Sequence, residues 1–249
     1  TAARLIPFII ALLLSTIALA AALVTGATPS DDALLAARWT ARAALPLFLI
    51  TYLASSLYRL TPNDVTRSLL QRRRQWGLAF ALSHSIHLVA LLINITLYRP
   101  RPLVSLAGGA LAYLFVYLMA ITSTEGWQRR LGHRWKQLHS IGMHLTWAVF
   151  LVGYGSRAFH QDPAYHLEGR IFTPLLLAAL AIRLWAKLGE GGERSQSEVR
   201  LVSGFATLGH QRLQLILYGE LHALQPLDSG KTRPVAAHFG AQLFIELLV

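Results

Sequence analysis

The sequence predicts an all-α fold, an integral membrane six-helix bundle with both termini in the cytoplasm. Three observations support this prediction. The chain is 54% hydrophobic and only 14% charged, with a mean hydropathy of +0.44, whereas roughly a quarter of the residues of a soluble domain are charged. Six apolar stretches are long enough to cross a hydrocarbon core of ~30 Å. The loops between these stretches divide the positive charges unequally between two sides.

The six expected spans need about 20 apolar helical residues each. Stretches of that kind, the last somewhat shorter, occupy residues 5–24, 41–60, 76–98, 103–122, 135–154 and 171–188. Proline, glycine and aspartate in the short connections break the helices there. Residues 5–24 could instead be a signal peptide, but the run is long for one and no small-residue cleavage motif follows. A true first span is therefore expected.

The orientation of the bundle follows from its loops. The loops on the side of both termini are rich in cations, namely Arg59, Arg67, Arg72, Arg73, Arg74, Arg129, Arg130, Arg134 and Lys136. The opposite loops hold fewer cations and mix them with acids, namely Asp31, Asp32, Asp162 and Glu168. Because positive loops stay in the cytoplasm, this side is predicted to be cytoplasmic. The net charge of +11 then fits anchoring to anionic membrane lipid, and no nucleic-acid partner is expected.

Four histidines lie inside two of the expected spans. His84 and His87 belong to the third span, and His139 and His144 belong to the fifth. From the helical rise, the first pair lies ~12 and ~16 Å beyond the start of its span, and the second pair ~6 and ~14 Å. A single histidine in a span could serve only to bond a carbonyl. A cluster of costly ionisable groups at similar depths predicts a site instead.

The spacing of these histidines limits how they can act together. His84 and His87 are about 60° apart around the helix axis and share a face, whereas His139 and His144 are about 140° apart and cannot both face one neighbour. Haem iron accepts one axial nitrogen from each side of the macrocycle. His87, His139 and His144 are therefore candidate metal ligands, and His84 is a further candidate for cofactor binding.

Other histidines carry weaker signals. His133 lies in a basic loop and is expected to be solvated. His160 and His166 could bind a metal together with Asp162, but a histidine pair in a loop is weak support for such a site. The chain has no cysteine, which excludes disulfides, thiolate metal sites and a cysteine nucleophile.

Two segments carry a family resemblance, "RRRQWGLAFALSHSIHL" at 72–88 and "ITSTEGWQRRLGHRWKQLHSIGMHLTWAVFLVGY" at 121–154. The chain resembles the ferric-reductase-like transmembrane domain family over about residues 39–188. Members of this family include the haem-binding membrane subunit of the periplasmic methionine sulfoxide reductase system and the membrane cores of NADPH oxidases. The resemblance implies six helices in a bacterial inner membrane, b-type haem with histidine ligands on the third and fifth spans, and electron transfer across the membrane.

The resemblance also assigns individual residues. His87, ten residues after Gly77, stands where the third-span ligand of the family stands, and His139 stands where the first fifth-span ligand stands. The sulfoxide-reductase branch has another histidine thirteen residues further on, but here that place is Val152, which cannot bind iron. One haem b is therefore expected, with two as the alternative, and its axial ligands are predicted to be His87 and either His139 or His144.

The sequence becomes more polar after residue 188. Residues 1–188 are predicted to form the six-span haem-binding domain, and 189–249 a polar linker followed by a mixed tail that could lie on the membrane as an amphipathic helix near 210–224. The tail is too short for a flavin or nicotinamide domain and has no G-x-G-x-x-G motif. Electrons must then come from a redox partner protein, a larger membrane complex, or a quinone or flavin donor site.

These features predict a haem b protein that relays electrons across the bilayer as one subunit of a redox system. No catalytic residue of its own is predicted. The alternative is a non-catalytic accessory subunit of a larger membrane complex, with haem structural or absent. A six-helix transporter is less favoured, since the spans contain almost no aspartate or glutamate.

Overall fold

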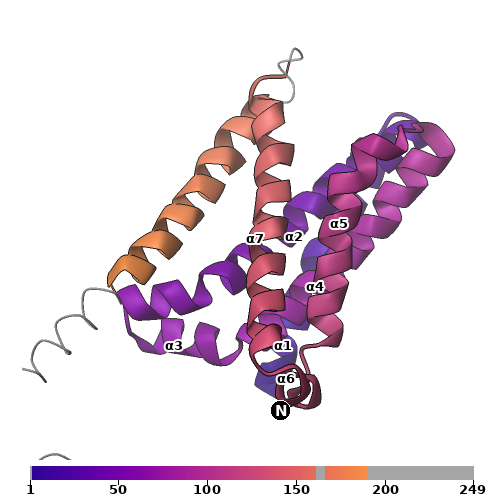
Figure 1. Ribbon diagram of the computed structural model, residues 1–249. Coiled ribbons are helices and arrows are strands. Elements are labelled where there is room, and N and C mark those ends of the chain that lie inside the picture. Colours follow the sequence, from indigo (N-terminus) through magenta and orange to yellow (C-terminus); the bar gives the residue numbers. More distant parts are fainter. Residues whose placement is uncertain (1, 161–165, 190–249) are drawn as a thin grey trace, which may run out of the picture. The chain divides into compact units, whose positions relative to one another are not determined.

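The computed structural model describes residues 2–160 and 166–189, and within these ranges the chain is helical with no strand. The all-α prediction is confirmed. The elements are α1 (Ala2–Thr25), α2 (Pro29–Leu60), α3 (Asp64–Gln71), α4 (Arg73–Ile93) continued by the π-helical turn η1 (Asn94–Tyr98), α5 (Leu103–Ile121), α6 (Glu125–Leu131), α7 (His133–Ala158) and a helix over His166–Gly189, here the 166–189 helix (Figure 1).

Five of these helices are long and apolar enough to cross a membrane: α1, α2, α4 with η1, α5 and the 166–189 helix. The predicted span at 135–154 is helical too, as part of the 26-residue α7. Its first turns are polar, with Arg134, Lys136 and His139, and α7 is not among the five. The described chain is thus a multi-pass membrane protein with five candidate spans. Six spans and cytoplasmic termini stay predictions.

Capping residues explain where the structure departs from the expected boundaries. Helix α2 begins at Pro29, well before residue 41, because Thr28 accepts a hydrogen bond from the Asp31 backbone and proline occupies the first helical turn. Two of the expected loops contain short helices. Asn63 forms a capping box at the start of α3, and α6 ends at Gly132, whose φ of +52° favours glycine.

The helices pack in two connected groups. Helix α2 packs against α1 and α4, and a buried hydrogen bond of 2.9 Å joins Ser15 of α1 to Ser83 of α4. Helix α7 lies between α5 and the 166–189 helix (Figure 1), and it is tied to the latter because Trp147 Nε1 donates to the Leu176 carbonyl at 2.9 Å. Both groups contribute to the buried core around Phe48.

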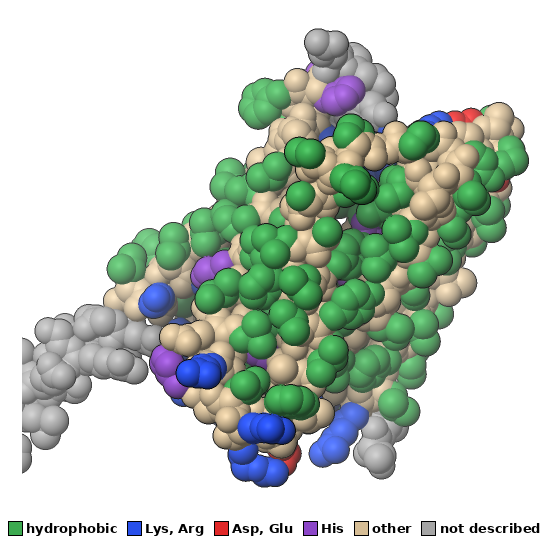
Figure 2. All heavy atoms as spheres, turned by 45° about the vertical axis from the view of Figure 1, so that its right-hand side comes forward, with side chains coloured by type: hydrophobic (Ala, Val, Ile, Leu, Met, Phe, Trp, Pro, Cys, Tyr) green, Lys and Arg blue, Asp and Glu red, His purple; other side chains and the backbone are tan. Residues whose placement is uncertain are grey.

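The outer surface of the bundle is apolar. Figure 2 shows hydrophobic side chains over most of the visible helices, with lysine and arginine side chains gathered near the lower end of that view. Large apolar side chains such as Val24 and Val104 are more than four-fifths exposed, at 84% and 88%. Such a surface is stable when lipid rather than water surrounds it.

Replacing Gly142 of α7 by valine is expected to destabilise the packing of α7 on α5, because a Cβ there would lie 2.7 Å from Met119 Sδ. Overpacking of this kind costs about 1–3 kcal/mol. The thermal unfolding temperature of the purified protein in detergent measures the effect. Gly108→Val on α5 is the matched control, since a Cβ at that position meets no atom within 4 Å. Equal unfolding temperatures for both variants would contradict the packing.

Candidate functional site

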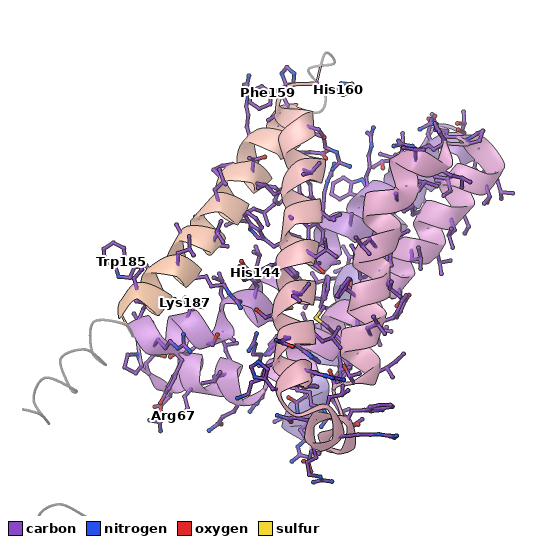
Figure 3. All side chains as sticks on the ribbon, in the orientation of Figure 1. Arg67, His144, Phe159, His160, Trp185 and Lys187 are labelled. Atoms are coloured by element: carbon purple, nitrogen blue, oxygen red, sulfur yellow. The ribbon has the colours of Figure 1, made fainter. Side chains whose placement is uncertain are left out.

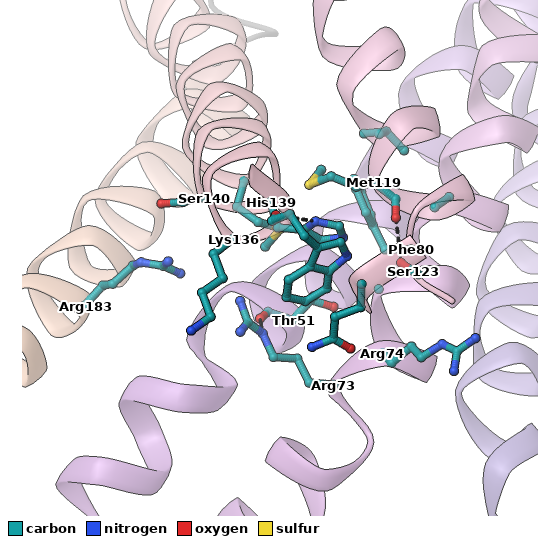
Figure 4. A pocket seen from close by; sticks show the side chains of 16 residues that line it. Thr51, Arg73, Arg74, Phe80, Met119, Ser123, Lys136, His139, Ser140 and Arg183 are labelled. Carbon is teal, nitrogen blue, oxygen red and sulfur yellow. Dashed lines mark hydrogen bonds between the residues drawn. The ribbon is translucent and has the colours of Figure 1, made fainter. Parts of the chain in front are cut away.

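The helices enclose a cavity of about 380 Å³, here cavity 1. Side chains reach it from α2, α4, α5, α7 and the 166–189 helix, among them Thr51, Phe80, Met119, His139 and Arg183 (Figure 4). Most of the wall is apolar. Cavity 1 therefore combines an apolar interior with one imidazole and several cations at its edge.

A second cavity of about 150 Å³, here cavity 2, lies among α2, α4, α5 and α7. Its wall includes His84, His87, Tyr113, Phe150 and Arg157. On α4 and α7 the residues of cavity 2 follow those of cavity 1 along the helix, and on the antiparallel α5 they precede them. The two cavities thus lie at successive levels along the same three helices.

Three phenylalanines lie at the level between the cavities. The ring centroid of Phe48 lies 5.4 Å from that of Phe80 and 5.3 Å from that of Phe150. Phe80 lines cavity 1, Phe150 lines cavity 2, and Phe48 is fully buried behind them. This aromatic cluster separates the two cavities with closely packed apolar rings.

His139 presents a free ring nitrogen beside cavity 1. Its Nδ1 lies 3.1 Å from the Trp135 carbonyl oxygen, and a carbonyl can only accept, so Nδ1 carries the proton and donates. The other nitrogen, Nε2, then carries a lone pair; it is buried, and no described residue forms a hydrogen bond with it. Metal-binding histidines commonly donate their second ring N–H to a backbone carbonyl in this way.

His84 and His87 lie together at cavity 2. Their ring centroids are 5.3 Å apart, so they share a face of α4, as their spacing predicted. His87 Nδ1 lies 3.3 Å from the hydroxyl oxygen of Thr40, which already donates its own proton to the Ala36 carbonyl at 2.6 Å. His87 Nδ1 must therefore donate, which leaves the lone pair on Nε2.

His144 lines neither cavity. Its exposed ring lies 5.8 Å from the ring of Tyr52, and Figure 3 places it on the flank of α7 that faces the 166–189 helix. His139 and His144 thus point to different surroundings, as their angular spacing predicted. The structure also places His139 and His87 at different levels, so it does not bring these two predicted ligands to one cavity.

Two arginines of cavity 1 bond to backbone carbonyl oxygens. Arg73 Nε donates to the Thr51 carbonyl at 3.0 Å, and Arg183 Nη1 donates to the Tyr52 carbonyl at 2.8 Å. The guanidinium of Arg183 also lies over the Tyr52 ring, 4.5 Å from its centroid. Within the described ranges, no carboxylate forms an ion pair with either arginine. Such a site attracts an anionic group, because half-buried charge without a counter-ion is costly.

The charges beside cavity 2 are neutralised differently. Glu168 of the 166–189 helix forms ion pairs with Arg42 of α2 and with Arg157 of α7, the latter at 3.1 Å. Glu168 is only 13% exposed, and Arg157 lines cavity 2. One carboxylate thus ties three helices together next to the histidines of α4.

Sequence reasoning missed Arg183 and the partners of Glu168. Arg183 stands inside a predicted span, and an ionisable group at such a position is a functional signal in itself. The weak metal hypothesis for the loop histidines is not tested, because Asp162 lies outside the described residues. Of the two loop histidines, His166 forms a hydrogen bond through Nε2 with the backbone carbonyl oxygen of His160.

These helices and cavities define a multi-pass helical membrane protein whose interior presents imidazole nitrogens to two stacked cavities. Comparison with known proteins gives the family. The chain is 31% identical over 164 residues to the protein-methionine-sulfoxide reductase heme-binding subunit MsrQ of Xanthomonas euvesicatoria, a match that covers 58% of this chain and 66% of that protein. It is 30% identical over 165 residues to MsrQ of Salmonella paratyphi B, which covers 58% of this chain and 73% of the relative. The chain belongs to the MsrQ family.

This result confirms the resemblance to the haem-binding membrane subunit of methionine sulfoxide reductase. The chain spans slightly less than two thirds of the length of the Xanthomonas relatives, at 66%. No family model matches the chain, so membership in the wider ferric-reductase-like group stays a prediction. No solved structure matches it either.

Replacing Glu168 by glutamine is expected to destabilise the bundle by roughly 1–3 kcal/mol, because Arg42 and Arg157 lose their shared carboxylate. The unfolding temperature in detergent reports the loss. Glu125→Gln is the matched control, since Glu125 and Arg129 are 3.9 Å apart and about four-fifths exposed, at 80% and 79%. Exposed pairs of this kind contribute about 0.5 kcal/mol or less. An unchanged unfolding temperature for Glu168→Gln would show that the three-helix ion cluster is not stabilising.

Proposed function

We propose that this chain is a haem b electron-transfer subunit of a bacterial inner-membrane redox system, with His139 as the haem ligand in cavity 1. The observation that carries the proposal is His139 Nε2, a buried lone pair without a partner beside a cavity of about 380 Å³. The names of the MsrQ relatives, which are haem-binding subunits, support it.

The residues of cavity 1 fit a haem. Its volume falls within the roughly 300–1,000 Å³ typical of cofactor sites. Phe80, Val116 and Met119 offer an apolar wall to the faces of a macrocycle. Arg73 and Arg183 supply positive charge, and no carboxylate of the described residues pairs with them, which suits the two propionates. A haem bound there would supply an iron that accepts and releases one electron.

Cavity 2 does not fit a haem, because its volume of about 150 Å³ lies below the range of roughly 300–1,000 Å³ that is typical of cofactor sites. Its wall nevertheless contains an oriented imidazole, since Thr40 contacts the Nδ1 of His87 at 3.3 Å.

The chain's own side chains would orient the group and exclude water from it. Trp135 holds the His139 ring by a hydrogen bond and by ring contact at 4.1 Å between centroids. The aromatic cluster of Phe48, Phe80 and Phe150 fills the space between the cavities. His139 and the nearby arginines Arg73 and Arg183 would influence the reduction potential of a haem held there.

The proposed function needs partners at both ends. A redox partner protein, or a quinone or flavin donor site, would deliver electrons near the arginines of cavity 1, and a reductase partner would accept them at the far face. Of the predicted linker and tail at 189–249, residues 190–249 lie outside the described residues.

The second candidate function is that of an accessory subunit with haem structural or absent. Val152 favours it, because this residue stands where the sulfoxide-reductase branch carries a histidine. Its side chain is 71% exposed and lines neither cavity. A subunit without a complete set of ligands could keep the fold while a larger complex carries the electrons.

Replacing His139 by alanine is expected to lower the haem content per chain by about half or more, because the one imidazole that the described residues contribute to cavity 1 is lost. The reduced-minus-oxidised visible spectrum and a haem extraction assay on the purified protein measure this. His144→Ala is the matched control, since the imidazole it removes belongs to the same helix but lines neither cavity. A wild-type protein without haem would leave the accessory function as the better explanation, and full haem content in His139→Ala would exclude His139 as a ligand.

A further inference from the structure

We infer that cavity 2 is filled with water and admits small hydrophilic solutes, from the end of the bundle where α7 ends, to the two imidazoles of α4. Its volume of about 150 Å³ is enough for about five water molecules at ~30 Å³ each. The inference goes beyond the proposed function and does not depend on it, because it needs no cofactor. It assigns an aqueous site to the interior of a membrane-embedded bundle.

The wall of cavity 2 carries polar atoms that the described residues leave unsatisfied. Nδ1 of His84 and the hydroxyl oxygens of Tyr113 and Tyr154 are buried, and none of them forms a hydrogen bond with a described residue. All three residues line the cavity. Buried polar groups without a partner are costly, so three in one wall favour a polar ligand. Water in such sites typically makes about three hydrogen bonds.

The hydrogen-bonding roles in this wall are mixed, which suits water better than an ion. His87 donates through Nδ1 to Thr40, so its Nε2 can only accept. Arg157 can only donate, whereas the hydroxyls of Tyr113 and Tyr154 can do both. The residues that line cavity 2 include no carboxylate. A metal cation therefore finds no counter-charge in the wall, while a neutral molecule that donates and accepts finds partners of both kinds.

The ion cluster of Glu168 connects cavity 2 to the end of the bundle. Arg157 lines the cavity, stands one residue before the end of α7 at Ala158, and has a side chain that is 28% exposed. Its partner Glu168 and the further partner Arg42 are 13% and 21% exposed. These charges keep the path from that end hydrophilic. In the other direction the aromatic cluster separates cavity 2 from cavity 1.

The absence of cysteine from the chain makes the inference directly testable, since single cysteines can report contact with water. Ala112 of α5 and Gly153 of α7 line cavity 2, and a Cβ added at Gly153 meets no atom within 4 Å. Their neighbours Leu111 and Val152 are 44% and 71% exposed and line neither cavity. Each pair compares two positions at similar depth, one in the cavity wall and one on the apolar outer surface.

The experiment treats native membranes that contain each single-cysteine variant with a charged methanethiosulfonate, and it measures the rate of modification by mass spectrometry. Ala112→Cys and Gly153→Cys are expected to react about tenfold or more faster than Leu111→Cys and Val152→Cys, because the thiolate is the reacting species and apolar surroundings suppress it. Labelling of the denatured proteins verifies that every variant carries its cysteine.

A second pair of substitutions tests whether the reagent travels through cavity 2. Gly109 lines the cavity and Gly108 does not, although an added Cβ meets no atom within 4 Å at either position. In the Ala112→Cys background, Gly109→Leu is expected to slow the modification severalfold because it fills the cavity. Gly108→Leu, the matched control, is expected to leave the rate unchanged.

Two results would overturn the inference. Slow modification of Ala112→Cys and Gly153→Cys, equal to that of their neighbours, would show that cavity 2 is dry or filled by lipid. Fast modification of all four cysteines would show that the reactivity reflects depth in the membrane and not the cavity.

Discussion

The hydrogen bond between His139 Nδ1 and the Trp135 carbonyl is the interaction on which the site depends, because it fixes which ring nitrogen carries the lone pair. Trp135 is itself anchored, since its Nε1 donates to the Thr122 carbonyl at the end of α5 at 2.8 Å. The close approach of Gly142 to Met119 holds the same two helices together one turn further along. The position of His139 is thus set by the packing of α5 and α7, and not by α7 alone.

The buried arginines beside the two cavities are compensated differently. At cavity 2, Glu168 neutralises part of the charge of Arg42 and Arg157 within the protein. At cavity 1, the bonds that Arg73 and Arg183 make within residues 2–160 and 166–189 go to carbonyl oxygens of α2. An anionic cofactor would therefore gain more from cavity 1, where it would supply the missing counter-charge. This difference makes the described bundle electrostatically asymmetric along its length.

The chain belongs to the MsrQ family, yet Val152 stands where the sulfoxide-reductase branch carries a histidine. The fold keeps an imidazole at each of two levels, His139 below the aromatic cluster and His87 above it. It lacks a second imidazole on α7 at the upper level, where Gly153 and Val149 stand instead. The departure at Val152 therefore lies outside both cavity walls.

The sequence by itself determined the helical class, the apolar stretches and the shared face of His84 and His87, because hydropathy and helical periodicity are local properties. Helix caps at Thr28 and Asn63, which are also local, could have placed the start of α2 and revealed α3. Only the tertiary structure decided that His87 and His139 belong to different cavities, and that Glu168 joins Arg42, 126 residues away. The rotation and register of each helix are set by packing between side chains distant in sequence, and no local pattern encodes them.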